Sequence, residues 1–305
     1  MRRRYEWLYT MIPKSWEGLT IEKVMKRKWK LPRKLRHDFR SGGKVLLNGE
    51  HPHWKTAVVH EGDELGLRLF EPSTVRIPAV DMNLEVLFED DHLLVVNKPA
   101  GVFTHPNGAE DGATLWNGVA YYSEQQSLPV LPKYIHRLDR HTSGAVLFGK
   151  HDLAIATLGE MMKKRRITRT YIAKVHGTME EDEGRIDSPI DKDPAHTTKR
   201  RVDENGKQAV TNYSVLYRDD EHTLIRLHLE TGRTHQIRVH LSSIGHPLLG
   251  DSLYGGSGDQ QGRQALHAAS LSFVHPFTEE SITCYASVET SPFFEEEDLS
   301  FLKSN

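Results

Sequence analysis

Residues 136–150 read HRLDRHTSGAVLFGK and join a polar turn to an apolar run. The apolar half, 145–150, predicts a β-strand. In the polar half a single carboxylate, Asp139, lies between Arg137 and Arg140. A turn aspartate that pairs with an arginine and accepts backbone N–H bonds would explain this arrangement. A catalytic carboxylate kept ionised by adjacent positive charge would explain it equally well, so this stretch alone leaves both interpretations open.

Apolar periodicity elsewhere in the chain predicts the fold class. Runs rich in apolar residues, several of them alternating with polar ones, predict strands at 92–98, 145–150, 170–177, 209–218, 222–230 and 281–287. Helices are predicted at 151–165, at 234–244 with Thr234 as a cap, and near 263–271. Because strands and helices do not alternate regularly, the pattern favours a mixed α+β domain over a doubly wound parallel sheet. We therefore expect a mixed, largely antiparallel sheet with flanking helices and a central active-site cleft.

Composition and cysteine usage narrow the class of protein. The chain has 305 residues, of which 37% are hydrophobic and 27% charged, as in an ordinary protein with a sizeable core. Cys284 is the only cysteine, which excludes an intrachain disulfide and a thiolate zinc cluster and indicates a cytoplasmic location. The sequence shows neither an export signal nor an uncharged run near the roughly 18 residues that span a bilayer.

Positive charge is concentrated towards the N-terminus. Residues 1–70 hold 16 Lys and Arg against 8 Asp and Glu, although the whole chain has a net charge of −2. The densest stretch, 23–44, predicts two short helices broken at Pro32, and short strand-like runs follow it. A solvated helix face is the usual explanation of such charge, but ten cations beside one acid favour contact with phosphates. The candidates for this contact are Lys26, Arg27, Lys30, Arg33, Lys34, Arg36 and Arg40.

A segment with little periodicity divides the chain. Residues 71–82 carry two prolines and predict a linker. We therefore expect a small α/β module at 1–70, a linker at 71–84 and a larger domain at 85–305.

Several other motifs are too incomplete to indicate a function. The 18 histidines fall partly in close pairs, but none has the spacing of two ligands on one helical face with a companion carboxylate, so no metal is expected. Ser143 does not lie in the glycine-flanked turn of a serine hydrolase. The glycine-rich segment 250–262 predicts a flexible surface loop, and the acidic runs 180–184 and 293–299 are typical of solvated loops.

Five segments of the chain occur together in an order that indicates a family. They are NKPAGVFTHP at 97–106, HRLDRHTSG at 136–144, RRITRTYIAKVHG at 165–177, LETGRTHQIRVHLSSIGHPLLGDSLYG at 229–255 and LHAASLSFVHP at 266–276. They resemble the signature segments of the RluA-type pseudouridine synthases, which convert particular uridines of ribosomal or transfer RNA to their C-glycoside isomer. The basic N-terminal module is similar to a small RNA-binding domain, named for a ribosomal small-subunit protein, that often precedes this catalytic domain.

The resemblance implies a role for four residues. Asp139 corresponds to the catalytic aspartate of the family, and Arg233 to the arginine that pairs with this carboxylate. Tyr171 corresponds to the aromatic residue that stacks on the target uracil and can assist removal of the proton from C5. Arg137 corresponds to the arginine that enters the space left by the flipped nucleotide. The resemblance also implies RNA as the partner, with no membrane and no cofactor, and we expect a monomer.

The chemistry of uridine isomerisation agrees with a single carboxylate. The C1′–N1 bond breaks, the uracil turns and C1′ rejoins at C5, so the sugar gains oxocarbenium-like charge that a carboxylate stabilises or traps. A hydrolytic glycosidase usually needs a second carboxyl group, whereas an isomerase does not. We therefore expect a pseudouridine synthase that acts on large-subunit ribosomal RNA. The alternatives are a transfer-RNA isomerase, a non-catalytic RNA-binding protein and an N-glycoside hydrolase. Further cations at 163–166 and 196–201 are candidates to follow the RNA backbone around the cleft.

Overall fold

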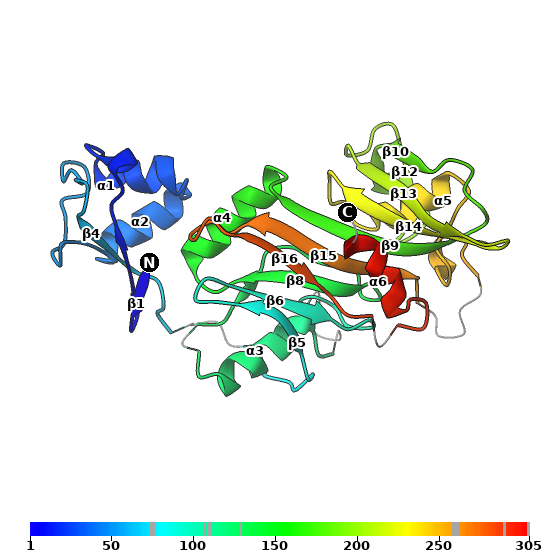
Figure 1. Cartoon of the computed structure of the whole chain (residues 1–305), viewed down its shortest axis with the longest axis horizontal. Helices are drawn as coiled ribbons and strands as arrows, with labels where there is room; N and C mark the ends of the chain where they lie inside the picture. The colour runs from blue at the N-terminus through cyan, green and yellow to red at the C-terminus, as the bar shows by residue number, and fades with distance from the viewer. Residues whose placement is uncertain are drawn as a thin grey trace.

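The structure is a computed structural model that describes residues 1–72, 77–106, 108, 112–128, 130–257, 263–288 and 291–303. Its strands form a four-stranded, a ten-stranded and a two-stranded sheet. Figure 1 shows the small N-terminal sheet beside the large sheet. Every named strand pair of the described residues is antiparallel except β8 (Ser143–Gly149) with β15 (Leu266–Val274). The predicted α+β class with a mixed, largely antiparallel sheet is confirmed.

The N-terminal unit packs short helices onto the small sheet. Its strands, in the order β1-β2-β4-β3, are β1 Arg2–Arg4, β2 Trp7–Met11, β3 Val45–Leu47 and β4 Glu64–Arg68. Its helical segments are a 3₁₀ turn at Lys14–Trp16, α1 Ile21–Lys23 with a π-helical continuation at Val24–Lys28, and α2 Arg33–Ser41. The Thr20 side chain caps α1, and the helices are separated at Pro32 as the sequence predicted.

The large sheet forms the body of the molecule. Its strands run in the order β10-β13-β14-β9-β15-β8-β6-β5, with β16 on β15 and β7 on β8. Besides β8 and β15 they are β5 Glu85–Glu89, β6 Leu93–Lys98, β7 Lys133–Tyr134, β9 Ile167–His176, β10 Glu183–Asp187, β13 Val210–Arg218, β14 His222–Leu229 and β16 Ser281–Tyr285. The two-stranded sheet pairs β11 Ile190–Lys192 with β12 Arg200–Val202.

Four helices and a 3₁₀ turn belong to this part of the chain. They are α3 Leu115–Gln125, α4 Asp152–Lys163, α5 Gln236–Ser243, the 3₁₀ turn Ser252–Tyr254 and α6 Glu296–Lys303. Among the residues that the structure describes, no helix has both the length and the hydropathy needed to cross a membrane.

Two local predictions were wrong. Residues 263–271, predicted as a helix, contain the beginning of β15, which lies between β9 and β8. Most of its side chains are buried, so the strand lacks the two-residue alternation that marks a half-buried strand. The acidic runs predicted as solvated loops contain parts of β10 and α6. The predicted loop at 250–262 lies partly outside the described residues.

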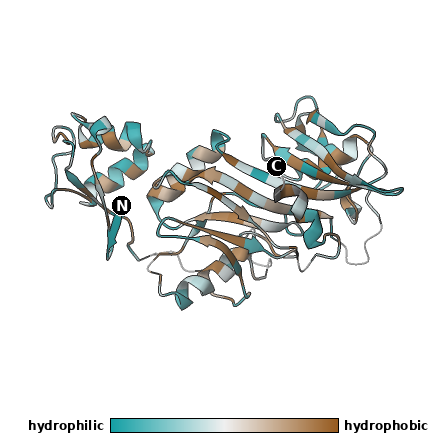
Figure 2. Ribbon diagram, viewed as in Figure 1, coloured by the Kyte–Doolittle hydropathy of each residue, from teal (hydrophilic) through white to brown (hydrophobic). Residues whose placement is uncertain are grey.

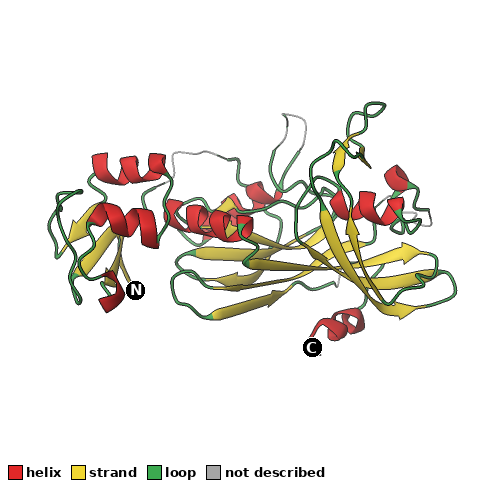
Figure 3. Cartoon of the chain, turned by 90° about the horizontal axis from the view of Figure 1, so that it is seen from above, coloured by secondary structure: helices red, strands yellow, loops and turns green. Residues whose placement is uncertain are grey.

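Alternate residues of the central strands enter two different cores. Leu93 and Val95 of β6 belong to a core that includes residues of α4, whereas Leu94 and Val96 belong to a core that includes residues of α3. Figure 2 shows β6 and β8 as largely hydrophobic ribbon. A third cluster joins α6 to β9, β14 and β15, and Figure 3 shows α6 beside the C-terminus on one side of the sheet.

Gly144 sets the spacing between β8 and β15. Its φ is +116°, and a Cβ at this position would lie 2.6 Å from the backbone nitrogen of Ala268. The two strands pair in parallel here, with His267 opposite Ser143 and Ala268 opposite Gly144. The close approach therefore requires glycine a few residues after Asp139.

The N-terminal unit contacts the large sheet through aromatic and ionic groups. Arg3 of β1 lies over the ring of Phe70 at 4.2 Å and pairs with Asp91 at 3.1 Å. Phe70 in turn contacts the ring of His151 edge to face, with 5.4 Å between ring centroids. These contacts join residues on both sides of the predicted linker.

Two buried histidines lie behind this contact. His151 Nδ1 accepts the N–H of Ala154 at 3.1 Å, so its Nε2 donates to His92 Nδ1 at 2.9 Å. Burial lowers the pKa of His92 to about 4, and burial also lowers the pKa of His151 well below its ordinary value. Both imidazoles are therefore neutral near pH 7, as this hydrogen bond requires.

Part of the predicted linker packs against α3. Asn117 Nδ2 donates to the carbonyl oxygen of Pro78 at 2.8 Å, and the N–H of Val80 donates to the carbonyl oxygen of Asn117 at 3.2 Å. Residues near the end of the linker are thus hydrogen-bonded to the larger unit. The division into 1–70, 71–84 and 85–305 stays a prediction.

We predict that Gly144→Ala destabilises the fold by more than the roughly 1–3 kcal/mol of backbone strain alone, because the added methyl group would overlap the backbone of Ala268. Gly159→Ala is the matched control. Gly159 has nothing within 4 Å of its Cβ position and lies inside α4, where alanine is more stable than glycine by about 0.5–1 kcal/mol. Urea unfolding followed by circular dichroism measures both variants, and equal stabilities would contradict the prediction.

Acidification is expected to destabilise the contact between the two units. In the unfolded chain His92 and His151 bind protons near the ordinary pKa of 6.5, whereas in the folded chain they bind them only at lower pH. The free energy of unfolding should therefore fall as the pH drops from about 6.5 towards 4. Urea unfolding at a series of pH values measures this slope. The variant His92→Gln should show a shallower slope, and an unchanged slope would argue against a contribution from His92.

Candidate active site

A cleft of about 1070 Å³ opens beside Asp139. Its walls come from the turn between β7 and β8, the first half of β9, the end of α4 and the loop between β14 and α5. Arg137 and Asp139 lie two residues apart, whereas Tyr171 and Arg233 are far from them in the sequence, yet all four line this cleft. The fold thus brings the four predicted site residues to one cavity.

A buried lysine fastens the turn that carries Asp139. Lys98 is fully buried, and its Nζ donates to the carbonyl oxygens of Pro99, Val102 and Arg140 at 2.9, 2.7 and 3.0 Å. Burial lowers the pKa of Lys98 to about 7, while the charge of Asp139 opposes this shift. Three carbonyl acceptors match the three protons of an ammonium group. The side chain therefore ties the end of β6 to the residue that follows Asp139.

Thr104 holds the residue that precedes Asp139. Its Oγ1 donates to the carbonyl oxygen of Leu138 and accepts the N–H of Leu138, both at 3.1 Å. Leu138 is buried, while Arg137 and Asp139 line the cleft, as expected for alternate residues of an extended segment. Arg137 is exposed, and its Nη1 lies 3.2 Å from His105 Nε2.

Asp139 faces a guanidinium group and an imidazole ring. Its Oδ2 lies 3.5 Å from Arg238 Nη1 and 4.0 Å from His235 Nε2. The Asp139 side chain is 27% exposed, whereas those of Arg238 and His235 are 10% and 14% exposed. The carboxylate is therefore accessible from the cleft, and its two partners lie behind it.

Asp251 holds Arg238 in one orientation. Nε and Nη2 of Arg238 donate to the two carboxylate oxygens of Asp251 at 2.7 and 2.8 Å, a bidentate pair. The Asp251 side chain is 1% exposed, and the guanidinium group also lies 4.9 Å from the centre of the Tyr254 ring. With Nε and Nη2 occupied, Nη1 is the nitrogen left beside Asp139. The guanidinium group of Arg238 therefore interacts with two carboxylates, those of Asp251 and Asp139.

Tyr254 fixes the orientation of the His235 ring. Its hydroxyl oxygen accepts the N–H of Arg200 at 2.9 Å and lies 2.9 Å from His235 Nδ1. Burial raises the pKa of Tyr254 to about 12, so the phenol keeps its proton. The hydrogen bond at Nδ1 turns Nε2 of His235 towards Asp139. Burial also lowers the pKa of His235, which favours the neutral ring.

The structure corrects the arginine partner of Asp139. Arg233 Nε donates to the carbonyl oxygen of Gln208 at 3.0 Å, and Arg238 occupies the place beside the carboxylate. Arg233 precedes α5, whereas Arg238 lies in its first turn. Helix α5 begins at Gln236 and its N-cap residue is His235, so the predicted cap at Thr234 was also wrong.

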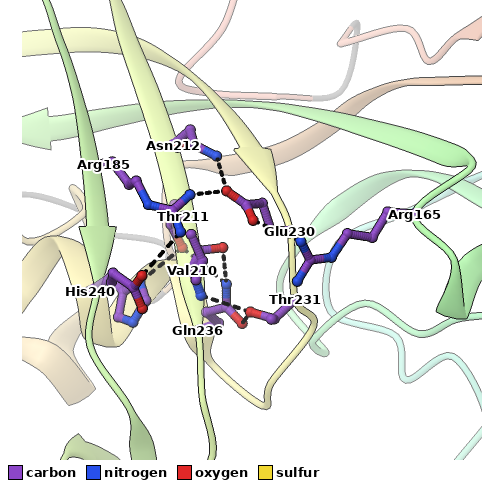
Figure 4. Close-up of polar contacts among 10 residues, drawn as sticks. Arg165, Arg185, Val210, Thr211, Asn212, Glu230, Thr231, Gln236 and His240 are labelled. Carbon is purple, nitrogen blue, oxygen red and sulfur yellow. Dashed lines mark hydrogen bonds and ion pairs between the residues drawn. The ribbon is translucent and has the colours of Figure 1, made fainter.

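Gln236 organises the turn before α5. Its Nε2 donates to the carbonyl oxygen of Val210 at 2.9 Å and to Thr211 Oγ1 at 3.1 Å. Its Oε1 accepts the hydroxyl proton of Thr231 at 2.7 Å and the N–H of Arg233 at 3.0 Å. Figure 4 shows this side chain between the loop and β13. A single buried amide therefore fixes both Arg233 and the start of the helix that carries the arginine beside Asp139.

Glu230 ties the end of α4 to the cleft wall. Its carboxylate accepts Arg165 Nη1 at 2.9 Å and Asn212 Nδ2 at 3.2 Å, and it also pairs with Arg185 (Figure 4). The hydrogen bond from Asn212 and the charges of the two arginines hold the pKa of Glu230 below its ordinary value. Arg165 is thereby fixed at the edge of the cleft.

Tyr171 lines the cleft as an uncharged aromatic residue. It lies in β9, is 4% exposed and packs in the same core as Leu138. Burial raises the pKa of its phenol, and the charge of Asp139 acts in the same direction. The phenol therefore keeps its proton at neutral pH, which favours a contact role over that of a base.

The predicted RNA-binding residues of the N-terminal unit lie on its helical segments and the turn between them. The exposed ones are Lys26, Arg27, Lys30, Arg33, Lys34 and Arg40. Arg36 is half-buried and donates to the carbonyl oxygen of Leu31. These helices appear largely hydrophilic in Figure 2.

The residues that orient Arg238 were missed from the sequence. Asp251 and Tyr254 lie both in the family segment 229–255 and in the glycine-rich segment that predicted a surface loop, but the sequence analysis assigned them no role. The sequence did contain an indication of the role of Arg238, because this arginine lies between two apolar residues, Ile237 and Val239, which are both buried. An arginine inside an apolar helical run requires a carboxylate partner.

Comparison with known proteins identifies a family for this chain. Residues 92–243 match the family described as RNA pseudouridylate synthase, and residues 8–65 match the RluD ribosomal pseudouridine synthase N-terminal domain. The Bacillus subtilis (strain 168) protein named uncharacterized RNA pseudouridine synthase YhcT is 40% identical over 288 residues, 94% of this chain and 95% of that protein. Ribosomal large subunit pseudouridine synthase D of Vibrio parahaemolyticus is 40% identical over 261 residues, 81% of this chain and 80% of that protein.

A solved structure leads to the same class. Human RNA pseudouridylate synthase domain containing 1 superposes with a TM-score of 0.56 at 26% identity, over 75% of this chain and 98% of that one. The sheet, the cleft and these similarities define an RNA pseudouridine synthase, an isomerase that acts on RNA. Within that class, this chain belongs to the RluA-type family, as its five sequence segments predicted.

We predict that Asp251→Asn lowers the rate of pseudouridine formation about 10–100-fold, the range that outer partners of metal ligands carry. The variant keeps the size of the side chain but loses the charge that holds Arg238, so the guanidinium group can turn away from Asp139. Single-turnover release of tritium from RNA labelled at C5 of uridine measures the rate. Asp220→Asn, at an exposed aspartate, is the control. An Asp251→Asn variant that is folded and as fast as this control would refute the role.

Proposed function

We propose that this chain isomerises specific uridines of large-subunit ribosomal RNA to pseudouridine, with Asp139 acting at the reacting sugar. The observation that carries the proposal is the position of Asp139 in a cleft with Tyr171 and 3.5 Å from Arg238. Relatives named ribosomal large subunit pseudouridine synthase D, at 36–43% identity, support the choice of RNA.

The reaction exchanges one glycosidic bond for another. The C1′–N1 bond breaks, the freed uracil turns within the cleft, C1′ bonds to C5, the proton on C5 leaves and N1 gains a proton. Positive charge develops on the sugar as the first bond breaks, and a carboxylate beside C1′ stabilises or traps it. Asp139 and Glu230 both line the cleft, but Glu230 is paired with Arg165 and Arg185, so Asp139 is the carboxylate that we assign to this role.

Arg238 lies beside that carboxylate without forming a close pair with it. Its bidentate bonds go to Asp251, and its distance to Asp139 is longer, 3.5 Å. Two carboxylates and one guanidinium group carry a net negative charge, which is the sign that an oxocarbenium-like sugar requires. The His235 ring lies on the same side, with its Nε2 4.0 Å from the same oxygen atom.

Tyr171 supplies an aromatic contact for the uracil. The ring lies in a rigid central strand, so it can hold the base while the base turns between its two attachments. Because burial raises the pKa of this phenol, we assign removal of the C5 proton to Asp139, which lines the same cleft.

The remaining cations position the RNA. Arg137 is exposed at the cleft, where it can fill the gap that an extruded nucleotide leaves in a helix, at a cost of a few kcal/mol for unstacking. Arg233 lines the same cleft and is placed for a phosphate contact. The exposed cations of the N-terminal unit are proposed to contact the RNA backbone further away.

Three further expectations accompany this proposal. A monomer is expected, and the elution volume of the purified protein in size-exclusion chromatography tests this. The steps above use side chains alone and require no cofactor. A ribosomal RNA substrate fits the cytoplasmic location expected from cysteine usage.

We predict that Asp139→Asn abolishes pseudouridine formation, a loss of several orders of magnitude, while RNA binding persists. The amide keeps the shape of the side chain but can neither stabilise nor trap the sugar. Asp191→Asn, at an exposed aspartate of β11, controls for loss of charge. Tritium release measures turnover, and retained turnover in Asp139→Asn would disprove the assignment.

Mapping pseudouridine in RNA from cells with and without this protein identifies the substrate. A site missing from large-subunit ribosomal RNA supports the proposal. A site missing from transfer RNA instead would assign the alternative substrate, and unchanged maps would leave only RNA binding. Release of free uracil by the purified protein would indicate an N-glycoside hydrolase.

A further inference from the structure

His235 lies beside Asp139, yet the reaction described above gives it no task. It is the residue before α5, it lines the cleft, and its side chain is 14% exposed. Its Nε2 lies 4.0 Å from Oδ2 of Asp139, and its Nδ1 lies 2.9 Å from the hydroxyl oxygen of Tyr254. The two nitrogens of one ring therefore face Asp139 on one side and a buried phenol on the other.

The backbone of His235 has a conformation that few side chains favour. Its φ is 58° and its ψ is 20°, in the left-handed region where glycine is the unstrained residue. As the N-cap of α5 it makes no side-chain hydrogen bond to the helix. Capping therefore does not account for a histidine at this position. Backbone strain of this kind is common at functional sites, and here it directs an imidazole ring into the cleft.

Packing fixes the ring on the side away from Asp139. The rings of His235 and Tyr254 meet edge to face, with 5.7 Å between their centroids and 87° between their planes. Tyr254 is itself held, because its hydroxyl oxygen accepts the N–H of Arg200 and its ring lies 4.9 Å from the guanidinium group of Arg238. The imidazole therefore cannot turn freely, and Nε2 stays on the side of the carboxylate.

Burial leaves the ring neutral and able to accept a proton. The anions near the ring are Asp139 and Asp251, and their charges raise its pKa. The cations Arg238 and Arg200 oppose them. Burial has a larger effect than any of these charges and lowers the pKa of His235 below its ordinary value. A neutral imidazole has one nitrogen with a free lone pair, so it can take up one proton.

The isomerisation requires a proton to move between two atoms of the base. C5 loses a proton to Asp139, and the electron pair of the C5–H bond returns to the ring, so the base is left with a negative charge that N1 shares. N1 then has to gain a proton, and Asp139 has to be ionised again before it can act on another sugar. A second group that accepts the proton from Asp139 and delivers it to N1 meets both requirements.

We propose that His235 is a catalytic residue that carries this proton from Asp139 to N1. The proposal rests on the proposed function, because it uses the same cleft and the same reaction. It requires the tautomer in which Nδ1 holds the proton and donates it to the oxygen of Tyr254, so that Nε2 is the acceptor. Catalytic hydrogen bonds are commonly long in a free enzyme and shorten when the substrate binds, so a separation of 4.0 Å suits such a transfer.

The two transfers balance without any further reactant. The O–H bond of Asp139 breaks as Nε2 binds the proton, which gives an imidazolium ion. The N–H bond at Nε2 then breaks as N1 binds the proton, and in each transfer the electron pair of the broken bond stays on the group that gives the proton up. Asp139 is then ionised again, His235 is neutral again, and N1 holds the proton that replaces the one lost from C5.

Three full-length variants test the proposal. His235→Gln keeps a polar side chain but cannot carry a proton. His235→Gly removes the ring at a position whose φ of 58° suits glycine, so the turn before α5 should keep its conformation. His60→Gln, at an exposed histidine of the N-terminal unit, is the control. The probe is total RNA from cells that lack this protein, labelled with tritium at C5 of uridine, and tritium release is followed over repeated turnovers.

His235→Gln is expected to turn over about 10²–10⁴-fold more slowly than the control, the range of general acid–base catalysis. Imidazole added to His235→Gly should raise its rate by more than about tenfold. Pyrazole, a ring of the same size and a far weaker base, should leave that rate unchanged. A merely structural role would not respond to the basicity of the added ring.

Two results would overturn the proposal. One is a His235→Gln variant that turns over as fast as His60→Gln. The other is a His235→Gly variant that imidazole and pyrazole restore equally, or that neither restores, because the ring would then only fill space or orient Asp139. Failure of the proposed function is separate, since the unaltered protein would then release no tritium from this RNA.

Discussion

The bidentate pair between Arg238 and Asp251 is the constraint on which the active site depends. Both side chains are almost completely buried, and a buried guanidinium group without its carboxylate would carry a desolvation penalty of several kcal/mol. The pair therefore has one arrangement, and that arrangement leaves Nη1 3.5 Å from Asp139. A charge placed rigidly before the substrate arrives does not have to reorganise during the reaction, which is the main source of electrostatic catalysis.

Asp139, the carboxylate that Nη1 of Arg238 faces, is held in place by other residues. Lys98 binds the residue after Asp139, Thr104 binds the residue before it, and Gly144 lets β8 and β15 approach closely just beyond the turn. None of these groups touches Arg238 in the contacts described above. Asp139 and its partner are thus positioned by different strands and loops, and the sheet is what brings them together. This explains why the site residues are scattered along the chain while the site itself is compact.

The sequence predicted the architecture more accurately than it predicted which residues contact Asp139. Strands such as 92–98 and 145–150 were predicted correctly because they combine strong apolar character with clear ends. Strand β15 was predicted as a helix because it is buried on both faces and so lacks the alternation of polar and apolar residues. Asp139 and Tyr171 followed from the family segments. Arg233 was assigned from the family resemblance, and Arg238, five residues later in the same segment, was not considered. Which of the two faces the carboxylate depends on where α5 begins. That position is set by the contacts of Gln236 with a distant strand, which no local pattern contains.

Lys98 has a consequence for how motion at the site can be observed. Its amine is fully enclosed, with three carbonyl oxygens around it, and burial brings its pKa to about 7. An unprotonated amine reacts readily with acylating reagents, but only when the reagent can reach it. Under conditions where acylation is faster than reclosing, the rate at which this one lysine is labelled in the native protein therefore equals the rate at which the loop around the catalytic turn opens.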